Sequence, residues 1–94
     1  MIEALDAEKI TVSTSAVGLT SAKLTAKVNK VFIHFEGTVR YWTSGKAPTS
    51  TDGIPTVSTD QLTLERTEAQ NLKMIRTGGA DVAVHVQYLY DRPN

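Results

Sequence analysis

The sequence predicts an all-β protein, a small antiparallel β-sandwich of about six or seven strands. Three observations predict this fold class. Thr and Val are abundant and Leu is not dominant, which is typical of strands. Several short stretches alternate apolar and polar residues with a period of two, and turn residues separate them. The chain has 94 residues, which fits a single domain over 1–94 with a modest core.

The composition excludes several classes of protein. Lys plus Arg and Asp plus Glu number ten each, so the net charge is zero, which argues against a nucleic-acid partner. The absence of Cys excludes disulfides and thiolate metal sites. No apolar run approaches the roughly 18–20 residues of a membrane span, so no membrane partner is expected. The acidic first ten residues do not resemble a secretory signal, and we expect a soluble protein made in a cytoplasm.

The first third of the chain gives the weakest pattern. Residues 1–9 are expected to form a flexible N-terminal arm, either reaching a neighbouring subunit or simply disordered. Residues 10–14 predict the first strand. Residues 15–29 contain some helical spacing, but Gly18 and several β-branched residues weaken a helix. We interpret them as a loop with a short turn.

Two alternating stretches follow. Residues 30–36 predict a clear strand, with one apolar face and one mixed face. Gly37 indicates a bend or bulge, after which residues 38–42 resume the alternation. Within 30–36, Val31, Ile33 and Phe35 share one face, and Phe32, His34 and Glu36 share the other. Within 38–42, Val39 and Tyr41 lie on the face opposite Arg40 and Trp42.

The loop over 44–53 and the strand before it supply the candidate interface. Trp and Arg are the residues that most often anchor interfaces, although Trp in a strand is more often a core residue. A lysine at the loop tip suits either a partner contact or an ordinary surface turn, and Ala47-Pro48 requires extended or turn geometry. The interface residues predicted from this stretch are Arg40, Trp42, Lys46 and Pro48.

The segment after the next strand is ambiguous. Residues 60–66 alternate with Leu62 and Leu64 inward. Over 67–77 a helix fits Thr67 and Gln70 as a capping box and Gly78-Gly79 as a stop. A strand over 70–76 with a hairpin turn at 77–79 also fits, and the neighbouring strands favour it.

The last strand, over 81–90, gives the strongest local signal. Its apolar face is uninterrupted and suits the middle of a sheet in a sandwich. The face consists of Val82, Val84, Val86, Tyr88 and Tyr90.

The sequence predicts no catalytic, metal or cofactor site. Only His34 and His85 offer a base of the usual kind, and each lies within an alternating strand, where an ordinary surface histidine is expected. An enzyme would require one of them beside a carboxylate in a concave pocket. No metal-binding spacing or nucleophile elbow is present, and Gly78-Gly79 lacks the other residues of a phosphate loop. We therefore expect a non-enzymatic protein without cofactors.

Two phrases together resemble a group of small virion-associated proteins of tailed bacteriophages and prophages. They are RYWTSGKAPTSTDG at 40–53 and LTLERTEAQNLKMIRTGGADVAVHVQYLY at 62–90, and ITVSTSAVGLTSAKL at 10–24 also fits. The resemblance implies a β-sandwich structural protein of the virion, made in the bacterial host cytoplasm. It implies partners among the major capsid, connector or tail subunits and a homo-oligomer. Capsid decoration or cementing is the first function it suggests, and a head–tail connector or tail role is the second.

The sequence departs from this group at Ser44, where the group usually has Asp before Gly45. Ser supports the turn more weakly than Asp. The loop also resembles a turn in β-sandwich domains attached to some chitin-degrading enzymes, which suggests a carbohydrate-binding module as an alternative. An exposed Trp42 ringed by polar groups would favour sugar binding, and a buried Trp42 with a self-complementary apolar edge would favour assembly.

Overall fold

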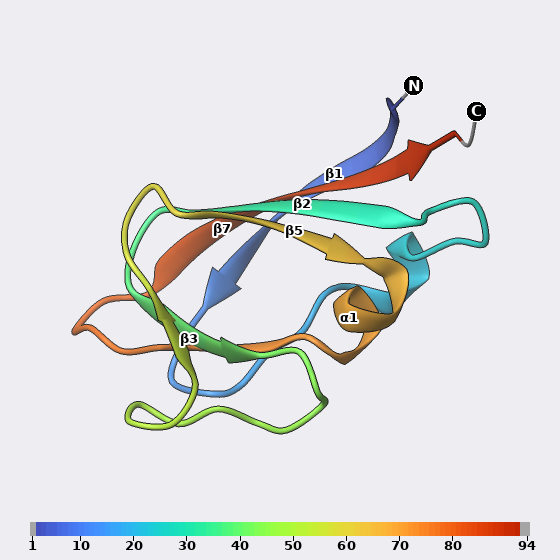
Figure 1. Ribbon diagram of the computed structural model, residues 1–94. Helices are drawn as coiled ribbons and strands as arrows, with labels where there is room; N and C mark the ends of the chain where they lie inside the picture. Colours follow the sequence, from blue (N-terminus) through green and yellow to red (C-terminus); the bar gives the residue numbers. More distant parts are fainter. Residues whose placement is uncertain (1, 93–94) are drawn as a thin grey trace.

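The computed structural model describes residues 2–92, and within them seven strands form two antiparallel sheets. This confirms the prediction of a small all-β fold. The sheets lie one above the other in Figure 1. The four-stranded sheet has, in spatial order, β1 (Ile2–Val12), β7 (Val82–Asp91), β2 (Lys30–Phe35) and β5 (Gln61–Glu65).

The second sheet has three strands among the described residues and is much shorter. Its spatial order is β4 (Ile54–Thr56), β3 (Val39–Trp42) and β6 (Lys73–Arg76). Two short helices are also present in residues 2–92, the 3-10 helix η1 (Ser21–Lys23) and the α-helix α1 (Arg66–Asn71).

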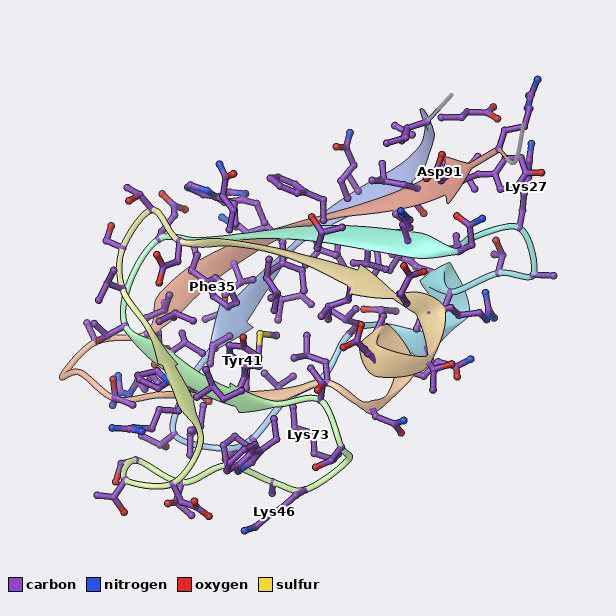
Figure 2. All side chains as sticks on the ribbon, in the orientation of Figure 1. Lys27, Phe35, Tyr41, Lys46, Lys73 and Asp91 are labelled. Atoms are coloured by element: carbon purple, nitrogen blue, oxygen red, sulfur yellow. The ribbon has the colours of Figure 1, made fainter. Side chains whose placement is uncertain are left out.

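The core lies between the two sheets, where the alternating faces predict it. Val31, Ile33 and Phe35 of β2 are fully buried. Across the core, the rings of Phe35 and Tyr41 stack with their centroids 6.2 Å apart and their planes at 16°. Both residues are labelled in Figure 2, in the space between the two sheets. This contact joins β2 of one sheet to β3 of the other. Offset stacking is one of the arrangements that pairs of aromatic rings prefer. The bend at Gly37 lets the chain pass between the two sheets.

Strand β7 occupies an interior position between β1 and β2, as its long apolar face predicts. Val82, Val84, Val86 and Tyr88 are buried, and Tyr90 is half-buried. Residues directly opposite in the ladder include Ile33 and Val86.

The N-terminal segment differs from the sequence-based expectation. Residues 2–9, expected as a flexible arm, belong to β1 and pair with β7 from Ile2 opposite Asp91 to Val12 opposite Val82. A bulge lies between Ala4 and Asp6. The strand was missed because its inward positions include carboxylates rather than apolar residues. Residue 1 lies outside the described residues.

The ambiguous segment 67–77 contains both predicted elements in succession. Helix α1 covers its first part and β6 its second. The N-cap of the helix is Glu65, two residues before the predicted Thr67, and the Glu65 N–H donates to Glu68 Oε1 at 3.2 Å. The predicted hairpin turn at 77–79 is wrong, because β6 and β7 lie in different sheets. The turn therefore carries the chain from one sheet to the other.

The loop predicted over 15–29 is confirmed, with η1 as its short turn. Arg66 at the start of α1 fastens this loop to the sandwich. Its guanidinium donates to the carbonyl oxygens of Val28 at 2.7 Å, of Leu24 at 2.8 Å, and of Thr25.

Candidate functional site

The four predicted interface residues lie together around the loop 43–53, which joins β3 to β4. The Arg40 guanidinium donates to the Gly53 carbonyl oxygen at 2.7 Å. Lys46 Nζ lies 3.0 Å from Asp52 Oδ2 and 5.6 Å from the centroid of the Trp42 ring. Pro48 is buried, whereas the head of Lys46 points outward in Figure 2. Each of these residues therefore has a partner or a packing position within its own chain.

Trp42 does not form an exposed aromatic platform. Its side chain is half-buried, and the Lys46 ammonium lies over the ring. Its indole Nε1 is buried without a hydrogen-bond partner among the described residues. Trp42 is neither exposed nor fully buried, so it meets neither of the two criteria set from the sequence. An interface role for the four residues stays a prediction.

The sheet edges differ in how much of their backbone is covered. Along β6, Val17 N–H donates to the Met74 carbonyl at 2.9 Å and Met74 N–H donates to the Val17 carbonyl at 2.8 Å. Arg76 N–H donates to the Ser13 carbonyl at 3.0 Å. The segment 13–17 therefore covers this edge.

Two further edges are short. Strand β4 has three residues, and Pro55 within it has no N–H to offer. Strand β5 has five residues and runs directly into α1. Short strands and Pro are features that protect sheet edges from pairing with other chains.

Strand β1 is the longest edge strand in residues 2–92, with 11 residues and no Pro or Gly. Figure 1 shows β1 and β7 running as a pair past the ends of the other strands of their sheet. Within the described part of the chain, β1 pairs only with β7. Its other side is the free edge.

The hydrogen-bond pattern identifies which backbone groups of β1 point outward. Glu36 N–H donates to the Ala83 carbonyl at 3.1 Å, so the backbone N–H and C=O groups of Ala83 point toward β2. In an antiparallel sheet the backbone groups of successive residues point alternately to the two neighbouring strands. The backbone groups of Val84 therefore point toward β1, where its partner is Ile10. In the part of β1 that follows the bulge between Ala4 and Asp6, the same alternation leaves outward backbone groups on Ala7, Lys9 and Thr11.

One of these outward groups is already satisfied. Ala7 N–H donates to Asp6 Oδ1 at 2.7 Å, which agrees with its position outside the ladder. Lys9 and Thr11 make no comparable bond among the contacts of residues 2–92. The bulge between Ala4 and Asp6 shifts the register of β1, so the uninterrupted stretch of its outward edge is the part that follows the bulge.

The inward carboxylates of β1 are occupied within the chain. Asp6 Oδ2 lies 3.0 Å from Lys23 Nζ, and this bond lowers the pKa of Asp6. Glu8 accepts hydrogen bonds from the Tyr88 hydroxyl and, at 2.7 Å, from the Thr20 hydroxyl. Burial, and then the bond to Glu8, raise the pKa of Tyr88. Asp6 is thus paired with a cation, and the Glu8 carboxylate is held by two hydroxyl groups of its own chain.

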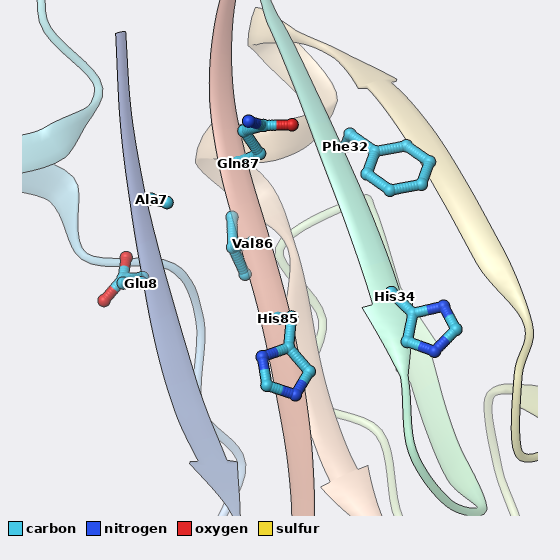
Figure 3. A pocket seen from close by; sticks show the side chains of 7 residues that line it. All are labelled: Ala7, Glu8, Phe32, His34, His85, Val86 and Gln87. Carbon is cyan, nitrogen blue, oxygen red and sulfur yellow. The ribbon is translucent and has the colours of Figure 1, made fainter. Parts of the chain in front are cut away.

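The outer face of the four-stranded sheet carries the second notable surface. A hollow of about 410 Å³ lies on it, shown in Figure 3. The half-exposed Phe32 is its largest apolar side chain, and Gln87 from β7 lies opposite Phe32 in the ladder. The lining residues are Ala7, Glu8, Phe32, His34, His85, Val86 and Gln87.

Both histidines of the chain line this hollow. His34 of β2 and His85 of β7 are direct partners in the ladder, and their imidazoles lie on the same face in Figure 3. His85 Nε2 lies 2.5 Å from Glu36 Oε2. A histidine thus does lie beside a carboxylate at a hollow, as an enzyme would require. The contacts of residues 2–92 place no hydroxyl nucleophile on either imidazole.

The described residues, 2–92, contain neither a cluster of metal-ligating side chains nor a membrane-spanning helix. No group of three or more His, Cys, Asp or Glu side chains there is arranged to hold a metal ion. None of the helices in residues 2–92 has the length and apolar character needed to span a membrane.

No protein-family model matches the sequence, and no curated protein or solved structure matches it significantly. The resemblance to phage virion proteins therefore rests on the quoted phrases alone.

Proposed function

We propose that this protein is a non-enzymatic structural subunit that works by protein–protein assembly. The free edge of β1 is the observation that carries the proposal. It belongs to the longest edge strand in residues 2–92, whereas β6 is covered and β4 and β5 are short. Unpaired N–H and C=O groups along such a strand are a template for pairing with another chain.

Assembly through this edge also suits the size of the protein. A domain of 94 residues has a modest core. Pairing at β1 would extend the four-stranded sheet into a neighbouring subunit and add buried area to both. Repetition of such contacts by symmetry multiplies weak interactions into a stable assembly. The zero net charge offers little repulsion against self-association.

The resemblance to phage proteins supplies the setting. In that setting the protein decorates or cements the capsid of a tailed bacteriophage as a homo-oligomer, with the major capsid protein as its partner. A place at the head–tail connector or in the tail is the alternative within the same class. The edge of β1 serves either position, because backbone pairing depends little on the partner's side chains.

The hollow on the outer face favours a second candidate, a carbohydrate-binding module. Phe32 offers an aromatic surface, and Gln87 and His34 supply polar groups beside it. Sugar sites combine an aromatic ring with a few hydrogen-bonding side chains. In this candidate Phe32 takes the role for which Trp42 was considered.

Light scattering behind a sizing column tests the first proposal. We expect a discrete oligomer whose mass is constant over a range of low micromolar concentrations. The variant Lys9→Pro removes an outward N–H and is expected to yield a folded monomer, because Pro is tolerated where an edge N–H faces solvent. Gln61→Ala, on the far side of the sheet, is the matched control and should keep the wild-type mass. A strict monomer at every concentration would contradict self-assembly.

Two binding assays distinguish the settings. Co-sedimentation with preformed tailed-phage capsid shells, connectors or tails is expected to give binding to shells alone for a decoration protein. A glycan array tests the second candidate, with Phe32→Ala as the variant that should lose binding and Lys46→Ala as the control. Sugar binding by a monomer that ignores every phage assembly would overturn the assembly proposal.

A further inference from the structure

We infer that His34 and His85 form an open chelate for a divalent transition-metal ion on the outer face of the four-stranded sheet. The two imidazoles are direct partners on neighbouring antiparallel strands. Figure 3 shows both side chains on the same face. This inference does not depend on the proposed function.

The strand geometry brings the two imidazoles within reach of one ion. Directly opposite residues of an antiparallel pair have Cβ atoms about 4.5–5.5 Å apart. A metal ion bound to two imidazoles at about 2.0–2.1 Å from each nitrogen spans such a separation with ordinary side-chain rotations. The His34 side chain is partly exposed, so it can make the small rotation required.

Glu36 gives His85 the arrangement of a metal ligand. Its carboxylate oxygen lies 2.5 Å from His85 Nε2. Because a carboxylate accepts hydrogen bonds, the ring nitrogen that donates this bond is Nε2–H. The other ring nitrogen, Nδ1, is then an unprotonated donor available to a metal. Carboxylates that hold the far nitrogen of a ligating histidine fix its ring and increase its basicity. Glu36 is therefore a positioning residue for His85.

The surroundings leave room for the rest of the coordination sphere. The hollow beside the pair has a volume of about 410 Å³, which accommodates an ion with its water ligands. Two protein ligands make an open site, in which water completes the coordination of the ion. Imidazole ligands select Cu²⁺, Ni²⁺ and Zn²⁺ over Mg²⁺ and Ca²⁺.

The sequence makes the assignment unusually easy to test. The chain contains two His and no Cys, so no other imidazole or thiolate competes for these ions. Binding would link β2 to β7 and stabilise the folded state in proportion to the ion's occupancy. The predicted order of affinity is Cu²⁺ above Ni²⁺ and Zn²⁺.

Calorimetric titration with CuSO₄, NiCl₂, ZnCl₂ and MgCl₂ tests the inference directly. We expect one Cu²⁺ per chain with micromolar affinity, weaker Ni²⁺ and Zn²⁺ binding, and no Mg²⁺ binding. His34→Gln and His85→Gln should each weaken Cu²⁺ binding by at least about tenfold. Gln87→Ala, which alters the same hollow without removing an imidazole, should leave the affinity unchanged. Circular dichroism confirms that each variant is folded.

A second measurement separates ligands from neighbours. Paramagnetic Cu²⁺ should broaden the imidazole NMR signals of both His34 and His85 at substoichiometric amounts. Glu36→Gln should weaken Cu²⁺ binding by about tenfold while keeping one ion per chain. Unchanged Cu²⁺ affinity in the double His variant would overturn the inference, as would broadening of one histidine only.

Discussion

The Tyr88 hydroxyl donates a hydrogen bond to the Glu8 carboxylate, joining β7 to the edge strand β1 beneath the sheet. Tyr88 is fully buried and the Glu8 side chain is half-buried. The bond gives the buried Tyr88 hydroxyl a partner, and a buried polar group without a hydrogen bond is destabilising. The edge strand is thus held in the sheet by a polar contact as well as by its ladder.

This contact predicts that the protein loses stability in alkaline solution. The pKa of Tyr88 is raised above the ordinary value of 10.0 by burial and by Glu8. Above that pH the unfolded chain loses the Tyr88 proton while the folded chain keeps it, so the free energy of unfolding falls as pH rises. Urea denaturation from pH 8 to pH 11 should give a shallower decline for Tyr88→Phe than for the wild type. Equal slopes would contradict the prediction.

Removing the Arg66 guanidinium should destabilise the protein substantially. Arg66→Ala leaves the carbonyls of Leu24, Thr25 and Val28 without their donor, and we expect a loss of about 2–3 kcal/mol in urea denaturation. Arg66→Lys should recover only part of this, because an ammonium cannot reproduce the planar fork. Thr67→Ala, at the next position, is the control. A wild-type midpoint for Arg66→Ala would show that the loop does not depend on this residue.

Gly53 should tolerate no side chain. Its φ is +144°, and an added Cβ would lie 3.1 Å from the Cβ atoms of both Arg40 and Pro48. We expect Gly53→Ala to cost about 1–3 kcal/mol, measured by thermal or urea unfolding. Gly79→Ala is the matched control, since its Cβ would meet nothing within 4 Å. Similar losses in both variants would contradict the account of this loop.

The Lys46 contacts should contribute little to stability. The side chain of Lys46 is 64% exposed and that of Asp52 is 49% exposed. Exposed ion pairs contribute about 1 kcal/mol or less to the free energy of unfolding. Lys46→Ala is therefore expected to unfold close to the wild type. The same variant tests the predicted interface: an unchanged oligomer mass would place Lys46 outside it, and a reduced mass would place it inside.

The elements predicted from the sequence are those whose signal is local. In β2 and β7 the apolar alternation is uninterrupted, and the structure buries those faces. In β1 the inward positions include Asp6 and Glu8, whose partners Lys23 and Tyr88 are 17 and 80 residues away. No window along the sequence reveals such a pairing, so the strand was missed.

Tertiary pairing also decided the segment 67–77. The segment contains both a helix and a strand, as its two sets of sequence signals indicate. The capping box is formed by Glu65 and Glu68, so α1 starts earlier than the predicted Thr67. Strand β6 then pairs with β3 rather than with β7. The hollow and the His34–His85 pair could not be predicted either, because they depend on the register between β2 and β7.

The free edge of β1 is tested most directly by amide hydrogen exchange measured at several protein concentrations. The account predicts that the amides of Lys9 and Thr11 exchange rapidly in dilute solution and slowly at concentrations where the oligomer forms. The amide of Ile10, which points toward β7, should be protected throughout. Rapid exchange of Lys9 and Thr11 within a fully formed oligomer would contradict the claim that β1 is the assembly edge.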